Sequence, residues 1–148
     1  MAAKSPGHTE IQFSYFKTTF RLKNPGKTIA WIEKVVKSEG ASSLSLSYVF
    51  CTDAYLLKIN QDYLGHDTLT DIITFEYSEN RTKELDGEIY ISVPRVKENA
   101  GNAGVDFAAE LRRVMIHGVL HLLGYGDKTL REKKEMRRKE DECLGVYE

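Results

Sequence analysis

Apolar and polar residues alternate in two early stretches of the chain, residues 11–15 and residues 44–50. This period of two is typical of strands with one buried face. Between the two stretches, apolar residues recur at helical spacing from Ile29 to Val36, and Gly40 can end that helix. The pattern therefore predicts a strand, a helix that starts near residues 24–28, and a second strand.

The middle of the chain predicts one helix and two further strands. Thr52 can cap the helix, whose apolar residues share one face as far as Tyr63. The run 72–75 is short, apolar and rich in β-branched residues, as is typical of a central strand. A polar segment, residues 78–86, separates it from the next strand, which is expected around residues 89–93.

The last third of the chain predicts three helices. Pro94 suits the first turn of the first helix, which is expected to end near residues 101–104. The second helix is predicted over residues 107–123, with Asp106 as its cap, and its second half is apolar nearly all round. Such a helix is expected to be buried. The final helix, residues 130–143, follows a capping-box sequence, and its mixed charges are typical of an exposed helix.

Length and composition favour one domain. The 148 residues are enough to bury a core, and the elements above predict a single α+β domain over residues 1–148, with residues 1–10 loose. We expect a small mixed sheet packed against several helices, with the helix 107–123 at the centre. The formal net charge is −1, so any contact with nucleic acid must come from a local patch. No run is apolar enough to act as a membrane anchor or signal peptide, which predicts a cytoplasmic protein without membrane partners.

Two histidines on the predicted buried helix indicate a metal site. His117 and His121 are four residues apart, so both lie on one face of a helix and can bind one ion. Gly124 suits the left-handed position that ends a helix, and Gly126 adds a second permissive backbone position. The chain can therefore turn back and bring Asp127 over the histidines. Two nitrogens and one oxygen leave a fourth tetrahedral position open, as in catalytic zinc sites.

Neighbouring residues suggest further roles and one alternative. Glu110 and Arg113 share the polar stripe of the two histidines and can orient an imidazole or contact substrate. His66 lies in the loop after the helix that Thr52 caps, where it can assist proton transfer or simply be solvated. The alternative for Asp127 is an ordinary turn residue.

Gly118 stands where H-E-x-x-H peptidases carry the glutamate that acts as general base. Its presence therefore argues against peptide hydrolysis. A glycine in the middle of a helix costs about 1 kcal/mol relative to alanine. We therefore expect either the close approach of another backbone or room kept for a substrate.

Three blocks of sequence resemble the YbeY family of bacterial metal-dependent endoribonucleases. Residues 117–125, His-Gly-Val-Leu-His-Leu-Leu-Gly-Tyr, resemble the family signature H-G-x-L-H-L-x-G-Y-D-H. Residues 60–75 and residues 87–92 resemble two further family blocks, in the same order. The chain departs from the family at two positions. Asp127 replaces the third histidine, and Leu64 stands where the family carries an arginine.

The resemblance implies a single-strand-specific endoribonuclease of the same α+β architecture. It further implies roles in ribosomal RNA maturation, notably at the three-prime end of the small-subunit RNA, and in ribosome quality control. Single-stranded RNA, ribosomal RNA and the ribosome are then the expected partners. His117 and His121 are expected to be catalytic as well as metal-binding.

The residues by themselves support only a metal-dependent hydrolase. Zinc is the expected cofactor, although two histidines and an aspartate also suit other divalent ions. Two alternatives stay open: a zinc hydrolase of another substrate such as peptides, and a ribosome-associated binding protein with a structural metal.

Overall fold

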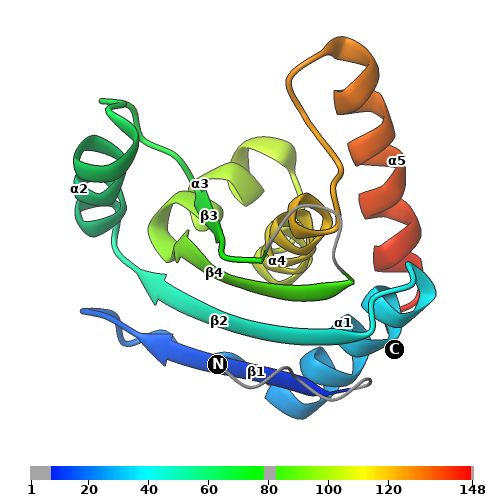
Figure 1. The fold of residues 1–148 in the computed structure, drawn as a ribbon. Coiled ribbons are helices and arrows are strands. Elements are labelled where there is room, and N and C mark those ends of the chain that lie inside the picture. Colours follow the sequence, from blue (N-terminus) through cyan, green and yellow to red (C-terminus); the bar gives the residue numbers. More distant parts are fainter. Residues whose placement is uncertain (1–7, 79–82, 148) are drawn as a thin grey trace.

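The computed structural model describes residues 8–78 and 83–147, within which four strands form one sheet and five helices pack on the sheet or on one another (Figure 1). In chain order the elements are β1 (Thr9–Tyr15), α1 (Pro25–Ser38), β2 (Ser43–Cys51), α2 (Asp53–Leu64), β3 (Ile72–Glu76), β4 (Glu84–Ser92), α3 (Val93–Ala103), α4 (Phe107–Leu122) and α5 (Leu130–Gly145). This is the order of strands and helices that the hydrophobic pattern predicted. The expected α+β class is confirmed.

The sheet is mixed, as expected, with the strand order β1-β2-β4-β3. β2 pairs in parallel with β1 and β4, and β3 pairs antiparallel with β4. β3 is therefore an edge strand, and the prediction of a central strand at residues 72–75 is wrong. The run is apolar because both faces of this edge are covered. Ile73 packs with the buried residues of α2, and Ile72 lies close to α4.

The polar segment between β3 and β4 was predicted to extend to residue 86, but it ends before Glu84. β4 already begins at Glu84, while residues 79–82 lie outside the described part of the chain. Leu85 is buried and lies opposite Leu44 of β2, so pairing with a central strand extends β4 through its polar neighbours.

The N-terminal stretch is also more ordered than predicted. Residues 1–10 were expected to be loose, but Thr9 and Glu10 pair with Leu44 and Ser45 of β2. Residues 1–7 lie outside the described residues. In the described ranges, none of the helices is both long and apolar enough to cross a lipid bilayer.

The final helix, α5, is mostly exposed as its mixed charges indicated, but one of its faces is buried. That face carries the buried residues Met136, Lys139, Glu140 and Cys143. Trp31 of α1 donates its indole N–H to the Cys143 carbonyl oxygen at 2.8 Å, and this bond ties the two helices together. Two charged side chains of α5, those of Lys139 and Glu140, are therefore buried against the rest of the protein, whereas most of the others face solvent.

α4 crosses the sheet as the central helix, and its second half is buried as predicted. The position that allows this close packing is Gly118. A Cβ atom there would lie 2.6 Å from Ile89 Cδ1 and 3.2 Å from Ile72 Cδ1. Glycine is thus needed at position 118 because side chains of the sheet fill the space where a Cβ would lie. The expectation that another backbone or a substrate takes that space is wrong.

Candidate metal centre

The turn after α4 brings Asp127 back toward the two histidines of the helix. Gly124 has a φ of 105°, in the region that glycine adopts without steric cost. Its N–H donates to the His121 carbonyl oxygen, and the Tyr125 N–H donates to the Leu120 carbonyl oxygen, both at 3.0 Å. These two bonds form a Schellman ending, so the prediction that Gly124 ends the helix is confirmed.

Gly126 has a different role from the one predicted. The φ angle of Gly126 is not positive, so the backbone there is not left-handed. A Cβ atom at this position would instead collide with the carboxylate of Glu132. That carboxylate accepts the N–H of Thr129 at 2.9 Å, while the Thr129 hydroxyl accepts the N–H of Glu132 at 3.0 Å. The predicted capping box is confirmed, and Gly126 leaves space for it.

Three ligand atoms converge where the turn meets α4. His121 Nε2 lies 3.0 Å from His117 Nε2 and 3.3 Å from Asp127 Oδ2. His117 Nε2 lies 3.4 Å from the same carboxylate oxygen. Among the described residues, this is the group of histidine, cysteine and acidic side chains with the geometry to hold a metal ion.

The donor set fits a tetrahedral divalent ion. Zinc bonds to nitrogen and oxygen at about 2.0 to 2.2 Å, which separates ligand atoms in a tetrahedral site by about 3.3 to 3.5 Å. The three observed separations are 3.0, 3.3 and 3.4 Å. Lone pairs of two imidazoles and a carboxylate at these distances repel one another unless a cation or shared protons lie between them.

Glu140 of α5 fixes the orientation of His117 from the other side of the ring. Its Oε2 lies 2.6 Å from His117 Nδ1, and its Oε1 accepts a hydrogen bond from Arg113 Nη1 at 2.8 Å. Burial raises the pKa of Glu140, but the hydrogen bonds from His117 and Arg113 outweigh it and hold that pKa below its usual value. The ionised carboxylate can only accept, so Nδ1 carries the hydrogen. In the neutral ring, Nε2 then keeps its lone pair for the cluster.

The same contacts shift the titration of His117. Burial alone lowers the pKa of its imidazole. The hydrogen bond to Glu140 and the negative charges of Glu140, Asp127 and Asp71 act in the opposite direction and raise the pKa overall. Protons and a metal ion therefore compete for this ring.

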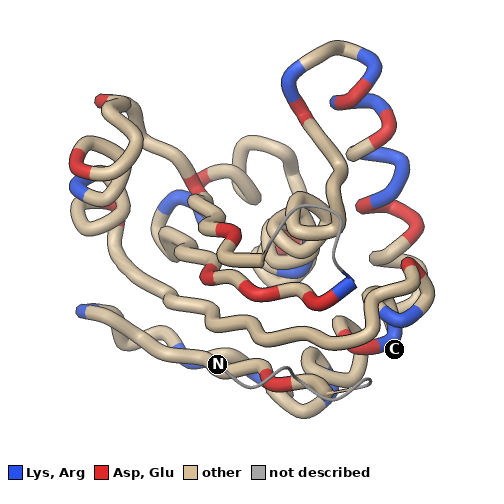
Figure 2. Tube along the Cα trace, viewed as in Figure 1, with Lys and Arg blue, Asp and Glu red and all other residues tan. Residues whose placement is uncertain are grey.

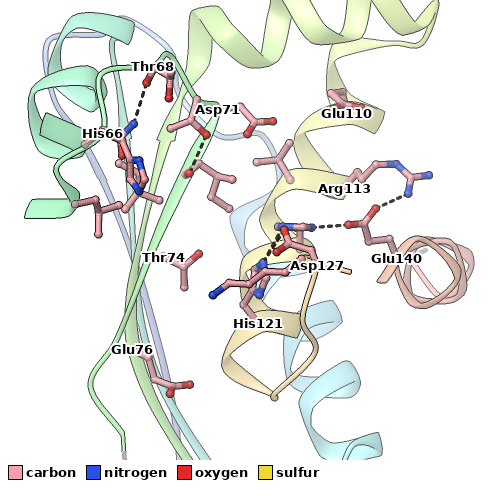
Figure 3. A pocket seen from close by; sticks show the side chains of 18 of the residues that line it. His66, Thr68, Asp71, Thr74, Glu76, Glu110, Arg113, His121, Asp127 and Glu140 are labelled. Atoms are coloured by element: carbon pink, nitrogen blue, oxygen red, sulfur yellow. Dashed lines mark hydrogen bonds and ion pairs between the residues drawn. The ribbon is translucent and has the colours of Figure 1, made fainter. Parts of the chain in front are cut away.

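The cluster lies in an open cleft of about 1050 Å³. One wall is formed by β3, the loop that precedes it and the end of α2, and the other by α4, the turn after it and α5 (Figure 3). All three residues of the cluster line this cleft. A substrate in the cleft thus has direct access to them.

The other predicted site residues fall in different places. His66 lines the cleft from the loop before β3, and its side chain is exposed. Glu110 lines the α4 wall, but within the described ranges it makes no hydrogen bond or ion pair to either histidine. Arg113 acts on the cluster only through Glu140.

Sequence reasoning missed Glu140 and Asp71. Glu140 had a detectable signal, because it lies four residues after Met136 and three before Cys143, on the apolar stripe of α5. Asp71 begins the β3 wall of the cleft and accepts a hydrogen bond from Asn99 at 3.3 Å. Burial raises the pKa of Asp71, against the opposing effect of its hydrogen bonds and of His117. Burial and the charge of Asp71 likewise raise the pKa of Glu110.

Comparison with known proteins gives a consistent result. The family model described as Endoribonuclease YbeY matches residues 14–148. A relative of that name from Amoebophilus asiaticus is 53% identical over 121 residues, which cover 82% of each chain. Another from Flavobacterium psychrophilum is 49% identical over 137 residues, covering 93% of this chain and 96% of the relative.

A solved structure supports the fold as well. The solution structure of a Thermotoga maritima protein matches with a TM-score of 0.63 at 28% identity, covering 91% of this chain and 87% of that one. The family model spans residues 14–148, which include α4, the turn after it and the three residues of the cluster. The chain therefore belongs to the YbeY endoribonuclease family.

Proposed function

We propose that this protein is a single-strand-specific, metal-dependent endoribonuclease that acts in ribosomal RNA maturation, notably at the three-prime end of the small-subunit RNA, and in ribosome quality control. Membership of the YbeY family supports the reaction and the substrate class. The observation that carries the proposal is the convergence of His117, His121 and Asp127 in an open cleft.

We further propose that these three side chains hold one zinc ion. The separations of their ligand atoms support this, as does the imidazole of His117, whose Nδ1 is already bonded to Glu140. When bound, zinc supplies Lewis-acid stabilisation of the charge that develops on a phosphoryl oxygen, and it makes water more acidic. His117 and His121 are then catalytic through the ion that they hold.

The residues around the cluster favour RNA over peptides as the substrate. The helix carries Gly118 where H-E-x-x-H peptidases have their general base, and the space beside it is filled by Ile89 and Ile72. No carboxylate can therefore act from that position.

The test compares cleavage of two polymers. Purified protein is incubated with an unstructured fluorescent RNA and with casein, with and without a chelator, beside His117→Ala. His8→Ala is the matched control, because His8 lies outside the cleft at the start of β1. We expect wild type and His8→Ala to cut RNA but not casein. Chelation should abolish cutting, added zinc should restore it, and His117→Ala should be inactive.

Three results would contradict the proposal. RNA cleavage that survives in His117→Ala would indicate a contaminating nuclease. Casein cleavage without RNA cleavage would make the protein a peptidase. Zinc binding without cleavage of either polymer would indicate a ribosome-associated binding protein with a structural metal.

A further inference from the structure

Basic side chains are unevenly distributed around the cleft. Three lysine or arginine residues line it, and all belong to the wall formed by α4, the turn and α5: Arg113, Lys128 and Arg137. Along α5, positions of lysine or arginine are interspersed with positions of aspartate or glutamate (Figure 2). The opposite wall, formed by β3, the loop before it and the end of α2, contributes no lysine or arginine to the described lining. A polyanion in this cleft is therefore attracted to one side.

Arg113 is not available to a ligand. Its Nη1 donates to Glu140 Oε1 at 2.8 Å, and its Nη2 donates to Asp141 Oδ1 at 2.7 Å. Only 18% of its side chain is exposed. Two carboxylates neutralise its charge, so its role is to hold Glu140.

Lys128 and Arg137 are different, because their charges are not neutralised. Lys128 is exposed, and its ammonium has no acidic partner within the described ranges. Arg137 is 66% exposed, and its one ion pair is a long contact of 3.9 Å to Glu140. Glu140 already accepts shorter bonds from His117 and Arg113. Both cations can therefore bind an anion without breaking a strong interaction.

Their positions place these cations beside the candidate metal centre. Lys128 directly follows Asp127, whose carboxylate belongs to the cluster. Arg137 lies one helical turn before Glu140, which bonds to His117. Both cations therefore line the same cleft as the cluster, on the wall that holds Asp127 and Glu140.

The opposite wall suits other parts of a nucleotide. It presents the hydroxyls of Thr68, Thr70 and Thr74, and the side chain of Leu64, which is 47% exposed. The carboxylates of Asp71 and Glu76 lie on the same wall and repel phosphate. Hydroxyl and apolar groups fit sugars and bases, whereas phosphates are favoured on the α5 side.

We propose that Lys128 and Arg137 bind phosphate groups of the RNA strand, so that the strand lies with its phosphates against the turn and α5, and with its bases toward Leu64 and the threonines of the opposite wall. This inference rests on the proposed function and adds the orientation of the substrate. It assigns to Lys128 of the turn and Arg137 of α5 the phosphate contacts that Leu64 cannot make, since leucine carries no charge.

Salt dependence of binding tests this placement. The affinity for a 2′-O-methyl single-stranded oligonucleotide is measured by fluorescence anisotropy at several salt concentrations, for wild type, Lys128→Gln and Arg137→Gln. The matched controls are Lys134→Gln and Arg131→Gln. Each removes one positive charge, as the cleft variants do, but these two residues line a separate groove. Each phosphate contact to a single strand adds about 0.7 to the slope of log affinity against log salt.

We expect each cleft variant to bind more weakly and to lose about 0.7 from the slope. The two controls should keep the wild-type slope, and all four variants should retain wild-type zinc content. Equal loss in cleft variants and controls, or unchanged slopes in the cleft variants, would overturn the placement but leave the proposed function standing. No binding by the zinc-loaded wild type at low salt would overturn the proposed function itself.

Discussion

His117 is held at its two ring nitrogens by different parts of the chain. Nδ1 bonds to Glu140 of α5, and Nε2 faces His121 and the Asp127 carboxylate that the turn supplies. Histidines that bind metals commonly donate their second nitrogen to a carboxylate, which fixes the tautomer and the ring orientation. At the scale of the residue, the bond to Glu140 therefore orients the imidazole of His117 so that its Nε2 faces the other two side chains of the cluster.

Replacing Glu140 should weaken metal binding. Glu140→Gln removes the negative charge from His117 Nδ1 and leaves Arg113 with one carboxylate partner. We expect zinc affinity to fall by about 10- to 100-fold, the range seen when such supporting partners are lost. Competition with a chromophoric chelator measures this, and circular dichroism checks the fold.

The matched control for this change is Glu135→Gln. Glu135 lies on the same helix and pairs with Arg138 at the surface, away from the centre. If the two variants bind zinc with equal affinity, Glu140 has no role in orienting His117.

At the scale of the element, α4 combines a tightly packed face with the ligand face. Gly118 lets the helix approach Ile89 and Ile72, while His117 on one side of it faces the cleft. The Schellman ending then fixes where the chain leaves the helix. The position of the ligands thus depends on how closely the helix lies on the sheet.

A methyl group at Gly118 should destabilise the protein. Alanine favours a helix by about 1 kcal/mol over glycine, but here its Cβ would be 2.6 Å from Ile89 Cδ1. Overpacking of a filled core costs about 1 to 3 kcal/mol, so Gly118→Ala should lower the free energy of unfolding. Urea denaturation measures it.

Gly101→Ala provides the comparison within another helix. A Cβ at Gly101 of α3 meets nothing within 4 Å, so this variant should be neutral or more stable than wild type. Equal stability of the two alanine variants would show that Gly118 is not needed for packing.

At the scale of the whole molecule, a bound metal would join α4 to the turn after it, and Glu140 continues the connection to α5. The hydrogen bond from Trp31 to the Cys143 carbonyl oxygen connects α5 in turn to α1, which is distant in sequence. A ligand that binds only the folded chain raises its stability.

The effect of metal removal should depend on pH with a definite sign. The folded pKa of His117 is raised in the metal-free protein, because the interactions with Glu140 and Asp127 outweigh burial. Its contribution to stability is thus present below the unfolded pKa of about 6.5 and is lost as pH rises through the folded value. Metal binding needs the unprotonated ring and follows the opposite trend.

We therefore expect the difference in melting temperature between zinc-loaded and chelated protein to widen from about pH 5.5 to about pH 7.5, on either side of the ordinary histidine pKa. Differential scanning fluorimetry measures it, and zinc should leave the melting temperature of His117→Ala nearly unchanged. A constant difference across this range in wild type would show that His117 does not bind the ion.

The kind and order of the elements and the centre of the candidate site could be predicted from local patterns along the chain. Alternation, helical spacing and capping residues act between near neighbours, so they identify the strands, α4, the ending at Gly124 and the shared face of His117 and His121. Asp127 could also be predicted, because only the short turn after α4 separates it from His121.

The remaining features could not be predicted in this way, because they depend on contacts between residues that are far apart in the chain. Periodicity cannot show that β3 lies at the edge of the sheet, since an apolar run fits any strand covered on both faces. It also cannot show that Glu140 reaches His117. Nor can it show that Arg113 pairs closely with two carboxylates, while Arg137 has a long contact of 3.9 Å to Glu140 and Lys128 has no acidic partner among the described residues. These outcomes follow from how α5 docks on α4, because that packing determines which charges are paired and which face the cleft.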